Sequence, residues 1–305
     1  MPRFVQFRLI DAFAETPYTG NPAGVVLNAD ELDDTQMQLV AREINASETA
    51  FVIGGNDLHR PPRLRWFAPI AEVQFCGHAT LATAHALTEL APPDEIQARA
   101  DAGMRFTTAA GELAIRGEPL GDGLNWWLEM PSAGLQPERS KLNELYALLG
   151  VRAEEVDEGV PAMRTRDQDV ILFLHECQRL LNLKPNQGEL GEWSRQRGIR
   201  GICVSTLNTL SPSVNVHSRF FAPAVGIAED PVTGSVHGAL AVLLVANQLV
   251  PHVGGRSAMN CMQGVPGGRT GMLRALVETT PNGHHTLVGG RCHTTLRGEM
   301  LVPAS

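Results

Sequence analysis

Two stretches of the chain repeat one pattern of apolar and polar positions. The first, residues 65–87, reads RWFAPIAEVQFCGHATLATAHAL, and the second, residues 219–245, reads RFFAPAVGIAEDPVTGSVHGALAVLLV. Each begins as a short apolar strand ending at proline, continues as a polar loop, and closes as a run that is apolar on nearly every helical face. Because such helices are normally buried, we predict two half-molecules, each built round a central helix, at about residues 77–90 and 235–246.

Patterns outside the repeat predict a strand-rich chain. Partial alternation indicates a strand at residues 4–13 with its return at 23–27, and Asp33 or Asp34 can cap a helix that runs to Ile44. Further strands are predicted at residues 49–53, 64–67, 105–115, 124–130, 170–174, 202–205, 214–221, 271–277, 285–288 and 293–301, with a short helix at 188–197. We therefore expect an α+β fold of two pseudo-symmetric domains, each a curled, mostly antiparallel sheet wrapped round its apolar helix.

Length and charge limit the classes of function. The 305 residues suit about two domains of about 150 residues, and the loop-like stretch at 121–125 is the predicted boundary between residues 1–122 and 123–292. A net charge of −8 argues against a nucleic-acid or anionic-membrane partner. Because the longest apolar run falls short of the roughly 20 residues of a membrane span, and no signal-peptide pattern opens the chain, we expect a cytoplasmic protein.

The five cysteines are scattered and form no CxxC pair, which predicts neither a disulfide framework nor a structural zinc site. Cys76 differs from the others because it directly precedes a predicted helix start, where the helix dipole lowers a thiol pKa. A two-thiol racemase would need a second cysteine at the matching place in the other half. Since Asp230 to Thr233 occupy that place, we interpret Cys76 as packing and leave its role open.

The two predicted helix starts are candidates for binding a carboxylate. The first N–H groups of a helix have no partner within the helix and carry partial positive charge. Gly77, in GHAT, and Gly234, in GSVH, would let a ligand approach those groups closely. Thr233 and Ser235 lie beside the second start. The alternative is that each glycine serves only a tight turn, but its recurrence at matched positions weakens that interpretation.

Three side chains near these starts are candidates for proton chemistry. Glu48 precedes the apolar strand TAFVI, where partial desolvation would raise its pKa towards neutrality. His78 follows Gly77, and a helix N-terminus favours its neutral imidazole. Asp230 can cap the second helix, accept a hydrogen bond from a substrate ammonium group, or act on a neighbouring carboxyl. For each residue a structural role is the alternative: a surface or capping glutamate, a half-buried histidine, a helix cap.

These motifs resemble the phenazine-biosynthesis PhzF-like family, which is part of the diaminopimelate epimerase fold superfamily. The matching segments span nearly the whole chain and are DAFAETPYTGNPAGVVL, NASETAFV, RWFAP with CGHATLATAHAL, RFFAP with GIAEDPVTGSVHGALAVLL, and the GGR at residues 289–291. The resemblance implies two similar domains with the active site in the cleft between them. It also implies that a last strand, near residues 293–305, can return to the first domain.

The activity that the resemblance implies is proton transfer without a metal or organic cofactor, as in dihydro-hydroxyanthranilate isomerase of phenazine biosynthesis. Carried over by motif, Glu48 with its neighbour Ser47 would move the proton, assisted by His78 and Asp230. Backbone groups of Gly77, His78, Gly234 and Ser235 would bind the carboxylate of a small substrate. A homodimer is expected.

Two alternatives stay open, an amino-acid epimerase or racemase and a non-catalytic carboxylate-binding protein. Residues 262–271, MQGVPGGRTG, differ from the family pattern, so the substrate does not follow from the resemblance.

Overall fold

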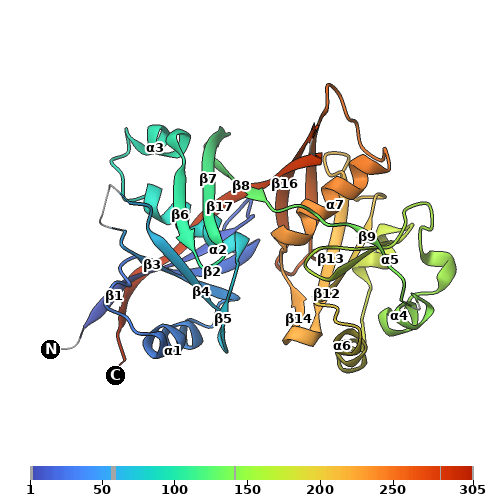
Figure 1. Ribbon diagram of the computed structural model, residues 1–305, viewed down its shortest axis with the longest axis horizontal. Helices are drawn as coiled ribbons and strands as arrows, with labels where there is room; N and C mark the ends of the chain where they lie inside the picture. The colour runs from blue at the N-terminus through green and yellow to red at the C-terminus, as the bar shows by residue number, and fades with distance from the viewer. Residues whose placement is uncertain (1–2, 56–59, 141, 282, 304–305) are drawn as a thin grey trace. The chain divides into compact units, whose positions relative to one another are not determined.

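The computed structural model describes residues 3–55, 60–140, 142–281 and 283–303, and its fold is mixed α/β and dominated by β-sheet (Figure 1). The chain divides into two compact units, Met1–Glu129 with Gly289–Ser305, and Met130–Val288. The boundary predicted at residues 121–125 falls on the turn of a hairpin, because β7 (Gly111–Leu120) pairs with β8 (Gly123–Met130).

The first unit contains the strands and the helix that carry the candidate residues of the N-terminal half. Its other elements are β1 (Phe4–Ala12), β2 (Asn21–Val26), α1 (Asp34–Ile44), β3 (Glu48–Ile53), β4 (Arg63–Phe67), β5 (Glu72–Val73), α2 (Gly77–Thr88), α3 (Ile96–Ala102) and β6 (Met104–Thr108). β1 pairs antiparallel with β2, β2 runs parallel to β3, and β3 pairs antiparallel with β4. The helix α2 packs on β1, β2 and β3, and its alanines are fully buried.

The local sequence explains why β3 begins where it does. Asp33 caps α1 and forms a capping box with Gln36, which confirms the predicted helix start. Asn45 ends the helix in the left-handed conformation, with φ of 53°, a conformation that asparagine tolerates better than most residues. The chain therefore turns back at once, and Glu48 becomes the first residue of β3.

The second unit contains its own set of strands and a buried helix. Its elements are β9 (Gln136–Pro137), α4 (Leu142–Leu149), η1 (Ala153–Glu155), β10 (Met163–Arg164), β11 (Asp169–Phe173), α5 (Cys177–Leu181), α6 (Gln187–Gln196), β12 (Gly201–Thr206), β13 (Val216–Ala222), η2 (Pro223–Val225), β14 (Ile227–Asp230), α7 (Gly234–Ala246), β15 (Arg256–Gln263) and β16 (Gly271–Thr280). β11 runs parallel to β12, which pairs antiparallel with β13. β13 pairs with β14 and runs parallel to β15, against which α7 packs.

The end of the chain forms one long strand, β17 (Gly283–Leu301), so the prediction of two separate strands, at residues 285–288 and 293–301, is wrong. Position 289 lies inside this strand, and glycine is needed there because the backbone of the neighbouring strand comes very close. A Cβ atom at Gly289 would lie 2.4 Å from the backbone oxygen of Trp126. From Cys292 to Leu301 the strand pairs antiparallel with β1.

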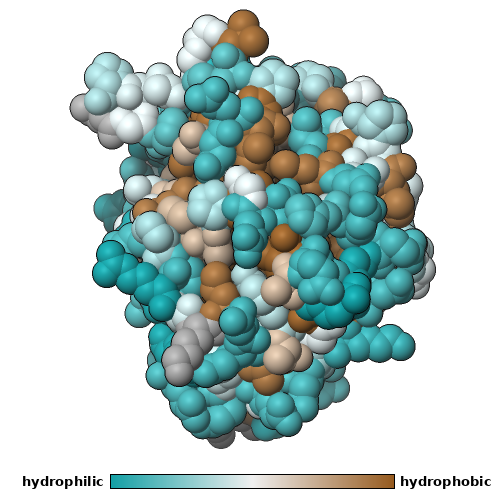
Figure 2. Space-filling model, turned by 90° about the vertical axis from the view of Figure 1, so that its right-hand side faces the viewer, coloured by the Kyte–Doolittle hydropathy of each residue, from teal (hydrophilic) through white to brown (hydrophobic). Residues whose placement is uncertain are grey.

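The apolar character of α7 is explained by burial within its unit, since every residue from Val236 to Val245 is buried. On the face of the molecule shown in Figure 2, hydrophilic side chains predominate and apolar atoms gather in limited patches. Within the described ranges, none of the helices combines the length and the apolar content needed to cross a membrane.

A cluster of charged side chains in the first unit joins the end of α2 to β1 and β17. Glu89 forms an ion pair with Arg8, accepts hydrogen bonds from Arg297 (2.7 Å) and Thr294 (2.9 Å), and lies 3.4 Å from His85 Nε2. Burial opposes ionisation of this carboxyl, but the hydrogen bonds and charge of His85, Thr294 and Arg297 outweigh it and lower the Glu89 pKa to about 2.

The depressed pKa of Glu89 predicts a specific loss of stability in acid. Since an unfolded glutamate binds its proton near pH 4.5, the unfolded state gains a proton first as the pH falls from about 4.5 to 2. Over that window the free energy of unfolding should fall by roughly 2–3 kcal/mol through this residue. Urea unfolding at pH 5 and pH 3 should show this fall in the wild type and a smaller one in Glu89→Gln. Glu112→Gln, on an exposed carboxyl, should keep the wild-type slope, and equal slopes in all three proteins would contradict the prediction.

Candidate active site

In the first unit, the predicted residues Ser47, Glu48, Gly77 and His78 lie together at the starts of β3 and α2. The Ser47 hydroxyl donates a hydrogen bond of 2.9 Å to Oδ1 of Asn21, which is completely buried at the start of β2. Because β2 runs parallel to β3, with Ala23 opposite Glu48, this bond fixes the backbone just before Glu48. Sequence reasoning missed Asn21, although it lies within the segment GNPAG that carries part of the family resemblance.

Glu48 and His78 are in contact through their side chains. Oε2 of Glu48 lies 3.3 Å from Nε2 of His78, and the two side chains are 16% and 9% exposed. Burial lowers the pKa of His78 to about 4, so the ring is neutral near pH 7. The neutral ring was predicted from the helix dipole, but burial is the cause of this shift. The contact therefore joins a carboxyl group to a neutral imidazole and is not an ion pair between two charges.

Cys76 is the N-cap residue of α2 and is buried against His78. Its sulfur lies 3.5 Å from Nδ1 and 4.0 Å from Nε2 of the ring. A thiol in line with the Nδ1 lone pair would be much farther from Nε2, so these similar distances place the sulfur against the ring face or its Cε1 edge. This geometry suits packing better than proton exchange with Nδ1.

Cys76, His78 and Glu48 are also the one group in the described part of the chain whose ligand atoms could hold a metal ion, since these atoms all lie within 4.8 Å of one another. Thiolate, imidazole and carboxylate are ligand types that zinc accepts.

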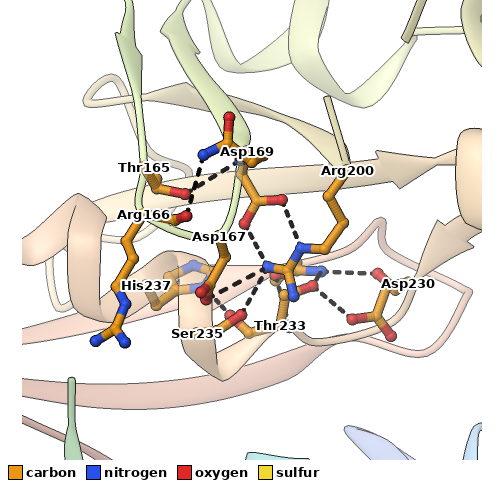
Figure 3. A network of polar contacts seen from close by, with 11 residues as sticks. Thr165, Arg166, Asp167, Asp169, Arg200, Asp230, Thr233, Ser235 and His237 are labelled. Carbon is orange, nitrogen blue, oxygen red and sulfur yellow. Dashed lines mark hydrogen bonds and ion pairs between the residues drawn. The ribbon is translucent and has the colours of Figure 1, made fainter. Parts of the chain in front are cut away.

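In the second unit, the predicted residues Thr233, Gly234 and Ser235 form the start of α7, and Asp230 ends β14 just before it. Figure 3 shows Asp230, Thr233 and Ser235. The Thr233 hydroxyl donates a 2.5 Å hydrogen bond to Asp230 Oδ2, and the Thr233 amide donates to Gln263 Oε1 at 3.0 Å. Gln263 Nε2 in turn donates to the Asp230 carbonyl oxygen at 2.7 Å. Asp230, Thr233 and Gln263 thus hold one another in place. Sequence reasoning did not single out Gln263, which lies in the stretch that departs from the family pattern.

Ser235 has a second set of neighbours that sequence reasoning missed. Nη2 of Arg200 donates to Ser235 Oγ at 2.9 Å, and the same guanidinium forms a two-pronged ion pair with the fully buried carboxylate of Asp169 (Figure 3). Burial raises the pKa of Asp169 against the effect of Arg200. The surrounding carboxylates raise the pKa of Arg200 despite its burial. A hollow between Thr165, Asp167, Ser235 and Ala239 has room for little more than a water molecule.

Comparisons with known proteins agree with the motifs. The family model for phenazine biosynthesis-like proteins matches residues 10–298. The uncharacterized isomerase PA2770 of Pseudomonas aeruginosa is 34% identical over 297 residues, covering 95% of this chain and 96% of that relative.

Solved structures agree on the fold. The crystal structure of a PhzF-family phenazine biosynthesis protein from Bacillus anthracis superposes with a TM-score of 0.87 at 24% identity, covering 98% of this chain and 100% of that one. A hydroxyproline epimerase from Agrobacterium vitis superposes with a TM-score of 0.62 at 12% identity, covering 99% and 94%, and shows the shared fold alone. With this fold, these motifs and a family model that matches nearly its whole length, the chain belongs to the phenazine biosynthesis-like PhzC–PhzF family of isomerases.

Proposed function

We propose that the protein is a cofactor-independent isomerase that moves a proton between carbons of a small carboxylate substrate, with Glu48 as the acid and base. The observation that supports this proposal most directly is the contact between Glu48 and neutral His78. A largely buried carboxylate at the start of a strand can accept a proton from a carbon acid, and a neutral imidazole beside it can donate a hydrogen bond to the carboxylate without adding charge.

The proposed reaction has two proton transfers and no net change in composition. Glu48, as carboxylate, removes a proton from a carbon that is acidified by conjugation, and the electron pair of that C–H bond passes into the conjugated system of the substrate. Glu48, now a carboxylic acid, returns the proton to another carbon of that system, so a double bond shifts and Glu48 is regenerated. His78 keeps the carboxyl group oriented throughout, and Asp230 is proposed to orient a polar group of the substrate.

The two helix starts are proposed as carboxylate-binding elements, Gly77 with His78 in the first unit and Gly234 with Ser235 in the second. Support for Gly77 comes from the absence of a packing reason for glycine there. A Cβ atom at Gly77 would make only ordinary contacts, the nearest 3.6 Å from Leu128 Cδ2. Glycine at this position would let a ligand approach the backbone closely, and at a helix N-terminus such a ligand would most simply be an anion.

Gly77→Ala should leave the protein folded while weakening substrate binding. Its free energy of unfolding should stay equal or rise by up to about 1 kcal/mol, because alanine is the better helix former. The methyl group should raise the KM of the exchanging substrate by roughly tenfold, about 1.4 kcal/mol of binding. In the control Gly201→Ala, the new Cβ would lie 2.3 Å from the Phe220 ring, so stability should fall by about 1–3 kcal/mol. An unchanged KM in Gly77→Ala would contradict the proposal that the substrate carboxylate binds close to the backbone at Gly77.

The function is tested by incubating the protein with cyclic amino and hydroxy carboxylates in D₂O and analysing the products by mass spectrometry and NMR. An isomerase incorporates deuterium and shifts a double bond. Deuterium at a stereocentre without a double-bond shift would instead establish an epimerase. Saturable binding of a carboxylate that shows no exchange would establish a non-catalytic binding protein.

We also propose that the two units are pseudo-symmetric repeats, each with a central helix. Support comes from the same succession of pairings in each: β2 to β6 with α2 in the first unit, and β11 to β15 with α7 in the second. The homodimer and the cytoplasmic location stay predictions from the sequence.

A further inference from the structure

The ion pair between Asp169 and Arg200 joins a fully buried carboxylate to a guanidinium whose side chain is 36% exposed. Asp169 is completely buried at the start of β11, and Arg200 directly precedes β12, the parallel neighbour of β11. Nε of Arg200 donates to Asp169 Oδ1 at 2.8 Å, and Nη2 donates to Oδ2. Asp169 loses its hydration in this pair while the guanidinium stays partly exposed, so the main consequence of the pair is to fix the orientation of the guanidinium beside Ser235.

That orientation determines how the Ser235 hydroxyl can bond. A serine hydroxyl has one donor and two acceptor positions, whereas a guanidinium can only donate. Since Nη2 of Arg200 donates to Ser235 Oγ at 2.9 Å, the contact uses an acceptor position of the hydroxyl and leaves its proton for another acceptor. Among the described residues no acceptor is recorded for that proton.

The neighbouring Thr233 is arranged differently. Its hydroxyl donates to Asp230 and its amide donates to Gln263, so both donors are used within the protein. Of the two hydroxyls at the start of α7, only that of Ser235 has its proton available for a ligand.

We infer that Asp169 and Arg200 are positioning residues that hold the Ser235 hydroxyl as a donor, so that the start of α7 selects the carboxylate of a ligand over an ammonium group. The inference rests on the proposed function, in which Gly234 and Ser235 bind a carboxylate. Three carboxylates, those of Asp167, Asp169 and Asp230, raise the pKa of Arg200 and by charge alone would attract a cation. For an anion to bind, the hydrogen-bond donors at the start of α7 therefore have to outweigh the negative charge of these carboxylates. Comparing an anionic probe with a cationic one measures which effect is larger.

The test follows the backbone amide NMR signals of Gly234 and Ser235 in the full-length protein during titration with acetate or with methylammonium. Acetate should shift both signals saturably, and methylammonium should not. Ser235→Ala and Arg200→Met should each raise the acetate Kd by about tenfold, the scale of one lost hydrogen bond. The double variant should bind no more weakly than Ser235→Ala, since Arg200 acts through Ser235.

Two further variants separate positioning from charge and from general damage to the unit. Arg200→Lys keeps the positive charge but replaces the Nε and Nη2 donors by a single ammonium group, so it loses the two-pronged hold on Asp169 and should bind acetate more weakly than the wild type. It also serves as the test if Arg200→Met fails to fold. Arg164→Met removes another arginine of the same unit, one paired with the largely buried Glu138, and should leave the acetate Kd unchanged.

Several results would overturn the inference: no acetate-dependent shift in the wild type, a preference for methylammonium, wild-type affinity in Arg200→Lys, or additive effects in the double variant. Failure of the inference and failure of the proposed function are distinguishable. If solvent deuterium exchange depends on Glu48 but acetate does not bind at the start of α7, only the inference is overturned. Acetate binding that depends jointly on Arg200 and Ser235, without any solvent exchange, would overturn only the proposed isomerase.

Discussion

Glu48→Gln is expected to abolish turnover while leaving the protein folded. Glutamine keeps the size of the side chain and can still accept a hydrogen bond from Nε2 of His78, which lies 3.3 Å from the carboxyl oxygen in the wild type. An amide cannot accept a proton from carbon and return it. General acid and base catalysis contributes factors of about 10²–10⁴, so kcat should fall by at least about 10³ because one residue performs both transfers.

The measurement is deuterium incorporation from D₂O into the exchanging substrate, together with urea unfolding of the variant. The free energy of unfolding should change by less than about 1 kcal/mol, since the contact with His78 is retained. Glu43→Gln, on the exposed side of α1 in the same unit, provides the matched control and should keep wild-type exchange. Full activity in Glu48→Gln would refute the assignment of Glu48 as the acid and base.

The largest expected effect on stability comes from Arg219→Met. Arg219 is 6% exposed, and its Nε and Nη2 each donate to Glu229 at 2.8 Å. Its remaining nitrogen, Nη1, donates to three backbone carbonyl oxygens near the end of α5, those of Leu180, Leu181 and Leu183. Methionine would remove the arginine's hydrogen bonds to those carbonyls and to the Glu229 carboxylate, and within the described residues only the Leu180 carbonyl would keep another donor, the Leu183 amide. The free energy of unfolding should fall by about 3–5 kcal/mol.

Arg65 is the matched control, because it occupies the same place in the first copy of the repeat. It also forms a two-pronged pair, with Glu72, and a second pair with Asp34, but these partners are 42% and 80% exposed. Exposed ion pairs contribute about 1 kcal/mol or less, so Arg65→Met should lower the free energy of unfolding by no more than that. Urea unfolding measures both variants. Equal losses would contradict the assignment of different structural roles to the two arginines.

Local patterns predicted most of the elements that hold the candidate site. The starts of α2 and α7, the cap at Asp33 and the strand that follows Glu48 all depend on residues within a few positions of one another. The strand β15 escaped prediction although it has eight residues. Its buried face includes Ser257 and Gln263, so the alternation of apolar and polar residues is weak.

The side-chain partners of the candidate residues were less predictable. Asn21 meets Ser47, and Asp169 meets Arg200, only because particular strands run parallel in a particular register. A shift of one residue in either register would turn these side chains to opposite faces of the sheet, and nothing in the local sequence specifies the register.

By itself the sequence determined the two buried helices with glycine at their starts, the strands that lead into them and, through its motifs, the family. These features arise from periodicity, capping and conformational preference, which act over short stretches of chain. Tertiary structure alone decided that Cys76 packs against His78, that Gly289 continues a strand instead of turning, and that Arg219 is buried while Arg65 binds exposed partners. These outcomes depend on which distant segments of the chain pack against each residue. Burial and the geometry of its partners decide whether a charge, a thiol or a glycine is stable at that place.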